Sequence, residues 1–498
     1  MLRLMIGKAG AGKTAAIINE IKRDMASAHG RALMIVPEQY SHEAERELCR
    51  VCGDRLSLYA EVLSFTGLAR ETAAKHGGGA EPWLDKGGRL LCMALALQSV
   101  GSRLRIYSAA QRRAELQALL LSAVDELKSA CIGYDALMSA ASSCPDSLGD
   151  KLSDLALILE AYDAAVANGR ADPADRLSIL AGQIDENTDI DANVKIYVDG
   201  FIDFTRQERE ILHAMLRRGA QLTVCLTVDA LDGDNEIFEL SRRAGRELLA
   251  YARELGAETE IVTLSEQSAK APELTVFADN MFSYSSDKYT PARDALRLYR
   301  TESMAAECEQ TAALCLEFVR DGGCRWRDIA VVARGFEDYR GSLESAFRHY
   351  GVPLFTARRD DLMSKPLPAL IALAYEIVRG GWAVDDVISY MRTGLAGLAP
   401  AECDVLENYI FKWQLQGGAW HRSADWRQHP DGYGCEYTDE TEETLRRVNA
   451  LRRTLAAPLL AFEEASSKAQ TAAQQAEALA GLFEALALPE QLSRRAGE

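Results

Sequence analysis

A glycine-rich stretch near the start of the chain constrains the fold more than any other feature. An apolar run at residues 2–6 leads into the pattern G-x-x-x-x-G-K-T, formed by Gly7, Lys8, Ala9, Gly10, Ala11, Gly12, Lys13 and Thr14. Between a strand and a helix, such a loop turns successive backbone N–H groups toward phosphate oxygens. Lys13 is then expected to reach the outer phosphates of ATP, and the Thr14 hydroxyl to hold Mg²⁺. The alternative is an ordinary glycine-rich turn without a ligand.

The order of apolar segments predicts a doubly wound α/β domain. Short runs typical of buried strands occur at residues 32–36, 56–59, 194–198 and 222–228, with helical stretches between them. Ligands of such sheets bind at the carboxyl ends of the strands, so the loops at 37–41 and 64–66 are expected beside the glycine-rich loop. Residues 86–183 have apolar spacings of three and four and no good strand, which predicts a helical insertion.

These patterns predict five segments. The first α/β domain takes residues 1–85 and 186–290, and a helical insertion takes residues 86–185. A second α/β domain is expected at 291–380, with strands at 295–299, 329–333 and 352–356. Residues 381–498 are expected to be a helical insertion that is cut within a domain. Three glycines at 77–79 close the first block, and a disordered loop is expected at 283–287.

Composition narrows the class of protein. The net charge of −18 argues against a uniformly basic nucleic-acid coat, but a DNA channel needs only local positive potential. No apolar run is long enough for a membrane span and no signal-peptide pattern occurs, so we expect a cytoplasmic protein without membrane contact. Cys49 and Cys52 form one C-x-x-C, which also fits a helix face, and no second pair follows it. The metal expected is the Mg²⁺ of a nucleotide.

Asp199 is the candidate for a second contact to that Mg²⁺. It directly follows the predicted strand 194–198, where nucleotide sites of this kind usually place an Asp. The alternative is a solvated acid in a turn. A hydrolytic enzyme normally has Glu directly after this Asp to polarise water, whereas this chain has Gly200. Asp203 or Glu208 could substitute, so the sequence supports nucleotide binding better than fast hydrolysis.

In this order, the segments resemble a superfamily 1 helicase core with two RecA-like domains and helical insertions. The closer resemblance is to the B subunits of AddAB-type helicase–nucleases, and it covers nearly the whole chain. It rests on the glycine-rich loop, on residues 36–39, 62–65 and 198–201 followed by Glu208, and on Glu307 with residues 328–334 and 350–355.

The resemblance implies a role in repair of double-strand breaks by homologous recombination. It implies an A-type motor subunit as partner, ATP and Mg²⁺ as cofactors, and contact with single- and double-stranded DNA, including scanning for the Chi sequence. The family's nuclease and its iron–sulfur cluster belong to a C-terminal half that nothing here matches. Nuclease activity is therefore not expected from these residues.

Four further features have two interpretations each. Arg334, the second catalytic candidate beside Asp199, could reach the γ-phosphate from the second domain or pair with Glu337. Gln39 and Phe65 lie on loops where helicase-like proteins contact single-stranded DNA; Phe65 could stack on a base or pack beneath the next helix. The arginines of residues 103–113 could follow a phosphate backbone or cover a solvated helix face.

Three functions fit these observations. The first is a DNA-processing helicase–nuclease subunit that binds ATP. The second is a non-catalytic, helicase-like scaffold for DNA recognition, in which the nucleotide site is structural. The third is an unrelated P-loop kinase or ATPase that acts on a small molecule, which would turn over ATP without DNA.

Overall fold

The computed structural model describes residues 1–498 except 27–30, 54–58, 77–82, 109–112, 168–169, 187–193, 265–270, 282–289, 291–294, 357–361 and 497–498. The chain divides into two compact units, Met1–Arg297 and Leu298–Glu498. The glycines at 77–79 and the loop expected at 283–287 lie outside the described residues. None of the described helices is both long and apolar enough to cross a lipid bilayer.

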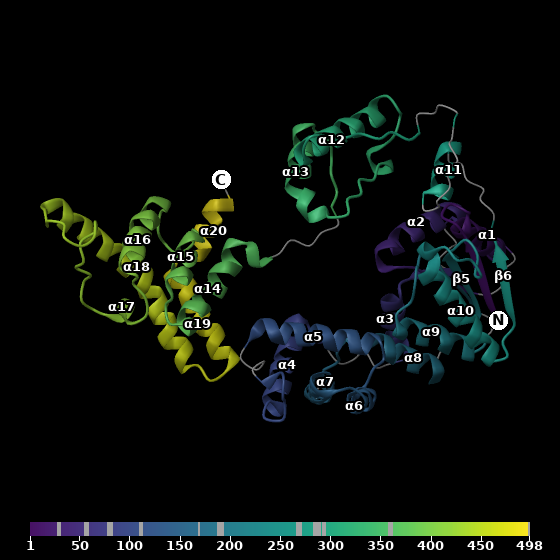
Figure 1. The fold of residues 1–498 in the computed structure, drawn as a ribbon, viewed down its shortest axis with the longest axis horizontal. Helices are drawn as coiled ribbons and strands as arrows, with labels where there is room; N and C mark the ends of the chain where they lie inside the picture. The colour runs from purple at the N-terminus through teal and green to yellow at the C-terminus, as the bar shows by residue number, and fades with distance from the viewer. Residues whose placement is uncertain are drawn as a thin grey trace. The chain divides into compact units, whose positions relative to one another are not determined.

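Six parallel strands form the centre of the first unit (Figure 1). They are β1 (Leu2–Gly7), β2 (Arg31–Ile35), β3 (Ala60–Leu63), β4 (Val194–Val198), β5 (Gln221–Thr227) and β6 (Thr259–Thr263). Their order across the sheet is β3-β2-β4-β5-β1-β6, with every neighbouring pair parallel. The predicted α/β class is confirmed. The strand expected at 56–59 instead begins at Ala60, and residues 54–58 are not described.

Helices cover both faces of this sheet, which explains why its strands are continuous apolar runs. On one face lie α1 (Lys13–Ala26) and α2 (Ser41–Cys52); on the other lie α3 (Phe65–His76), α8 (Arg176–Glu186), α9 (Arg206–Arg217) and α10 (Glu239–Glu254). Met34 and Ile35 are neighbours in β2 and both are fully buried. They belong to the two opposite cores because successive side chains of a strand alternate between faces.

The chain leaves the sheet after α3 and builds a separate group of helices before it returns at β4. These are α4 (Lys86–Val100), α5 (Ala114–Ser129), α6 (Tyr134–Ser143) and α7 (Asp146–Val166). They have their own core, which includes Leu97 and Tyr162, and they extend away from the sheet (Figure 1). Parallel pairing of Ile35 with Val198 joins β2 to β4 across this helical insertion.

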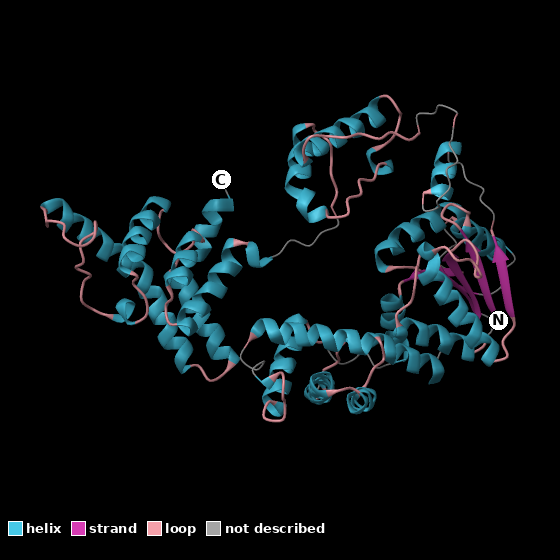
Figure 2. Cartoon of the chain, viewed as in Figure 1, coloured by secondary structure: helices cyan, strands magenta, loops and turns pink. Residues whose placement is uncertain are grey.

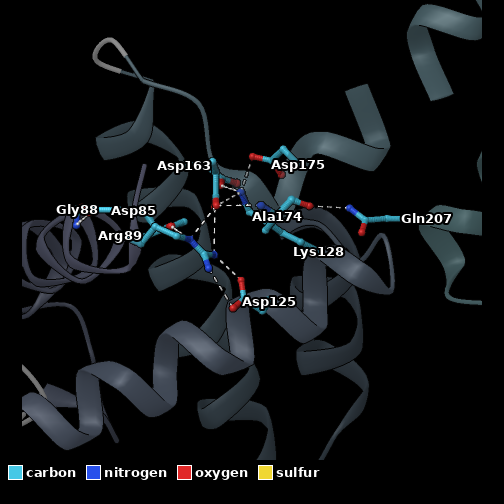
Figure 3. Close-up of polar contacts among 11 residues, drawn as sticks. Asp85, Gly88, Arg89, Asp125, Lys128, Asp163, Ala174, Asp175 and Gln207 are labelled. Atoms are coloured by element: carbon cyan, nitrogen blue, oxygen red, sulfur yellow. Dashed lines mark hydrogen bonds and ion pairs between the residues drawn. The ribbon is translucent and has the colours of Figure 1, made fainter. Parts of the chain in front are cut away.

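A polar network around the buried Asp172 holds the insertion together and ties it to the sheet domain (Figure 3). Its charged members are Arg89, Asp125, Lys128, Asp163, Asp172 and Asp175. The Lys128 Nζ lies 2.8, 3.1 and 2.7 Å from carboxylate oxygens of Asp163, Asp172 and Asp175. Gln207, at the start of α9, donates a 2.8 Å hydrogen bond to the carbonyl of Ala174 in the same network. Removing either cation would take one of two charged partners from the buried Asp172 carboxylate.

The first helices of the second unit are α12 (Met304–Arg320) and α13 (Phe336–His349). The strands predicted at 295–299, 329–333 and 352–356 are wrong: Figure 2 shows no strand among this unit's described residues, nor at 295–297. The run at 329–333 begins with extended backbone at Ile329 (φ −108°, ψ 128°) and packs on α12 and α13 through one face. Val332 and Phe355 remain 91% and 89% exposed. A strand is stable only where neighbouring backbone satisfies its N–H and C=O groups, and these runs have no such neighbour here.

From residue 366 the described chain is mainly helical, as the sequence predicts. The helices are α14 (Pro366–Gly380), α15 (Val384–Arg392), α16 (Pro400–Trp413), α17 (Gly418–His421), α18 (Asp439–Lys468), α19 (Ala472–Ala485) and α20 (Leu488–Ala496). Trp382, Trp420 and Trp426 are buried in their common core. The polar interruption between α16 and α18 thus contributes two of these three aromatic anchors.

Candidate functional site

The glycine-rich loop lies where β1 ends at Gly7 and α1 begins at Lys13. All strands of the sheet are parallel, so the carboxyl ends of β1, β2, β3 and β4 lie along one edge. The loops that follow β2 and β4 therefore share this edge with the glycine-rich loop. This is the edge at which ligands of doubly wound sheets bind.

The glycines of the loop meet two different constraints, close packing at Gly7 and positive φ angles at Gly10 and Gly12. A Cβ on Gly7 would lie 2.8 Å from both the Ala11 Cβ and the carbonyl oxygen of Leu264. Gly10 and Gly12 have φ angles of +87° and +82°, which side-chain-bearing residues rarely adopt. Since the loop also opens the 14-residue helix α1, it has the features that bind phosphate oxygens at a helix N-terminus.

Lys13 is held against the loop itself. Its side chain is buried, and its Nζ donates to the carbonyl oxygens of Gly7 (2.7 Å) and Lys8 (2.9 Å). Burial lowers the pKa of the Lys13 ammonium, and the nearby Asp199 carboxylate opposes that shift. The loop therefore positions a cation within reach of anions bound at its backbone.

Thr14 and Asp199 meet beneath the loop although 185 residues separate them. The Thr14 hydroxyl donates a 2.5 Å hydrogen bond to Asp199 Oδ2, and the Gly200 N–H donates to Asp199 Oδ1 at 2.9 Å. Asp199 is only 5% exposed. A hydroxyl and a carboxylate are the hard oxygen ligands that Mg²⁺ prefers, so this pair fits the predicted metal contact.

Gly200 explains why no acid follows Asp199. Its φ is +86°, and a Cβ at this position would lie 3.1 Å from the Pro37 Cδ. A Glu here would be strained by its backbone and crowded by Pro37. Neither predicted substitute is available: Asp203 pairs with Arg243 at 2.8 Å, and Glu208 accepts the Thr205 N–H at 2.8 Å in a capping box.

The structure separates the two candidate DNA contacts. Gln39 is exposed in the short helix η1 (Glu38–Tyr40), which follows β2 at the carboxyl edge of the sheet. Phe65 is 3% exposed, and its ring centroid lies 5.4 Å from that of Phe201. The structure favours the alternative that Phe65 packs in the core, because Phe201 and the surrounding residues cover its ring; stacking on a base stays a prediction.

Arg334 is exposed in the second unit, and its proposed reach to the γ-phosphate stays a prediction. Two features near the loop, an ion pair of Lys8 and the burial of Cys225, had no signal in the sequence. Lys8 forms a 2.5 Å ion pair with Asp279 of α11 (Pro272–Asn280), 271 residues away. Cys225 of β5 is buried, and its burial raises the pKa of the thiol, which therefore stays neutral.

Fold and site together define a class: an α/β protein with a glycine-rich strand-to-helix loop at the carboxyl edge of a parallel sheet. The model of the family described as "ADDB, N-terminal" matches residues 4–277, more than half of the chain. The chain belongs to this family. The resemblance inferred from the sequence is confirmed.

Curated relatives match over almost the entire chain. Proteins named as the B subunit of an ATP-dependent helicase/deoxyribonuclease, from Desulforudis audaxviator, Acetivibrio thermocellus and Clostridium acetobutylicum, are 32%, 29% and 26% identical to it. The matches cover 99%, 99% and 100% of this chain but 45%, 44% and 44% of the relatives. The chain thus spans less than half the length of the relatives it matches.

Proposed function

We propose that the chain is the nucleotide- and DNA-binding part of the B subunit of a heterodimeric ATP-dependent helicase–nuclease. The complex processes double-strand DNA ends and recognises Chi during homologous recombination repair, and an A-type subunit is its motor. Family membership and the names of the relatives support this role. Because the chain belongs to this family, we set aside the unrelated small-molecule kinase.

The contact between Thr14 and Asp199 supports ATP binding most strongly. The loop amides and Lys13 would bind the phosphates, while Thr14 and Asp199 would hold Mg²⁺, which neutralises phosphate charge. Lys13 already points to the loop's backbone, so little side-chain ordering would be needed on binding.

We further propose that this site binds ATP without hydrolysing it efficiently. The observation behind this is Gly200, where the backbone conformation and the nearby Pro37 disfavour the acid that would polarise water. The nucleotide would then stabilise or switch a DNA-recognition scaffold, and unwinding would depend on the partner. Arg334 stays the candidate for a contact with the γ-phosphate.

Single-stranded DNA is proposed to bind along the carboxyl edge of the sheet. The helices α2, α3 and α9 begin in or after the loops at this edge, and helix N-termini favour phosphate groups. Gln39 is the exposed side chain best placed to contact a base or sugar there. Contacts of this kind would operate despite the acidic total charge.

The test is titration of the chain with a fluorescent ATP analogue and Mg²⁺. Lys13→Ala removes a charge-assisted contact worth about 1.5–3 kcal/mol, so affinity should fall roughly 10- to 100-fold. The matched control is Lys22→Ala, on the exposed side of the same helix, which should bind as the parent does. Unchanged binding by Lys13→Ala would contradict the nucleotide site. Lack of single-stranded DNA binding at low salt, with and without an A-type partner, would contradict the DNA role.

A further inference from the structure

The segment around the end of α4 is positively charged, whereas the chain as a whole is negatively charged. Residues 86–114 contain six Lys and Arg residues and no Asp or Glu, whereas the whole chain has a net charge of −18. Four of the six are arginines within residues 103–113. Arg112 lies outside the described residues, but Arg103, Arg105 and Arg113 are described. A local concentration of positive charge on an acidic protein focuses the potential that attracts polyanions.

One buried carboxylate fixes the shape of this loop, residues 101–108. Asp154 of α7 is 1% exposed and accepts hydrogen bonds from the backbone N–H groups of Arg105 (3.0 Å), Ile106 (2.7 Å) and Tyr107 (3.0 Å). The Asp154 side chain thus faces the backbone of the loop rather than its guanidinium groups. A loop held in this way loses little conformational freedom when it binds a partner.

The arginines of the loop point to solvent. Arg103 and Arg113 are exposed, and neither forms an ion pair within the described part of the chain. The Arg105 side chain is 72% exposed and pairs with Asp150. Ile106, directly after Arg105, is 45% exposed. Figure 2 shows this loop at the end of α4, on the helical insertion and away from the sheet.

We propose that the loop at 101–108, together with Arg113, is a second nucleic-acid contact that binds the phosphodiester backbone. The planar guanidinium group matches phosphate oxygens bidentately, and backbone contacts position DNA without reading its sequence. This surface is distinct from the sheet edge and the glycine-rich loop. The inference rests on the proposed DNA-binding role, and it assigns part of that role to the helical insertion.

The experiment compares two double variants of equal charge change. Arg103→Gln/Arg113→Gln removes the two unpaired arginines. Arg218→Gln/Arg253→Gln is the control, because both residues are exposed at the C-terminal ends of α9 and α10. Affinities for labelled duplex and single-stranded oligonucleotides are measured by fluorescence anisotropy between about 50 and 200 mM salt. All four substitutions are on the surface, so circular dichroism and Tm should match the parent chain.

Each phosphate contact contributes about 0.9 to the salt slope for duplex DNA and about 0.7 for single strands. The Arg103/Arg113 variant should therefore bind roughly tenfold more weakly, with a slope smaller by up to about 2, while the control changes less than about twofold. Loss in the duplex arm, the single-strand arm or both supports the proposal and identifies the DNA form. A variant that behaves like the control overturns it, and leaves the proposed function standing if Gln39→Ala still weakens DNA binding. A parent chain that binds no DNA overturns both.

Discussion

Substitution of Gly200 by Ala tests the geometry that separates nucleotide binding from hydrolysis. A side chain at φ +86° costs about 1–2 kcal/mol. The 3.1 Å approach to the Pro37 Cδ adds about 1 kcal/mol of overpacking. Because Ala has less conformational freedom than Gly in the unfolded chain, the substitution also stabilises the fold by about 0.4–1 kcal/mol. We therefore expect a net loss of about 1–2.6 kcal/mol, which lowers Tm by about 2–4 °C for a unit that spans Met1–Arg297.

Thermal unfolding of three controls separates the cost of the backbone conformation at position 200 from the cost of the contact with Pro37. Gly256→Ala has a positive φ of +65° but open space around its Cβ, so it reports the backbone term alone. Gly182→Ala, exposed within α8, should be neutral or slightly stabilising because Ala favours helix. The double variant Pro37→Ala/Gly200→Ala should regain the stability that Gly200→Ala loses through its contact with Pro37. If Gly200→Ala has the same Tm as Gly182→Ala, the reasoning about position 200 is refuted.

Three other predictions concern the core. Lys128→Met should destabilise the chain by about 1.5–3 kcal/mol in urea unfolding, because it removes one of the two cations that pair with the fully buried Asp172 carboxylate and leaves only Arg89; a loss below about 0.5 kcal/mol would contradict this. Burial against Tyr251 lowers the pKa of His213 to about 4, below its unfolded value of about 6.5. Between these two pKa values the unfolded chain binds more protons than the folded chain. The free energy of unfolding should therefore be at its full value above pH 6.5 and fall by up to about 3 kcal/mol toward pH 4. His213→Phe should remove that pH dependence. Phe65→Ala should cost about 3–5 kcal/mol while single-stranded DNA affinity changes less than about twofold, and a selective loss of DNA binding would restore the stacking role.

Local patterns were sufficient to predict the central strands of the first unit, but not its edge strand β6 (Thr259–Thr263). Each of its central strands is a short apolar run buried on both faces, and the loop motif fixes what lies between β1 and α1. Asp199 could be placed beside Thr14 because parallel strands bring their carboxyl ends to one edge, and the 2.5 Å contact agrees with that placement. These inferences needed only residue periodicity and chain order.

The features that the sequence did not predict depend on distant partners. Residues 329–333 and 352–356 have the composition of strands, but whether a run becomes a strand depends on neighbouring backbone. Phe65 lies at the predicted edge, yet its burial is set by Phe201, 136 positions later in the numbering. The ion pair between Lys8 and Asp279 has no sequence signature, because either residue alone is an ordinary surface charge.

The Mg²⁺ dependence of ATP binding in Asp199→Asn tests the proposed nucleotide site most directly. This change keeps the size of the side chain and its hydrogen bond to Thr14 but removes the negative oxygen that would hold the metal. Asp203→Asn is the control, since Asp203 pairs with Arg243. We expect the gain in ATP-analogue affinity on replacing EDTA with Mg²⁺ to fall by about tenfold or more in Asp199→Asn, about 1.4 kcal/mol, and to stay unchanged in the control. An Asp199→Asn chain with the full Mg²⁺ response of the parent would contradict the assignment of this site.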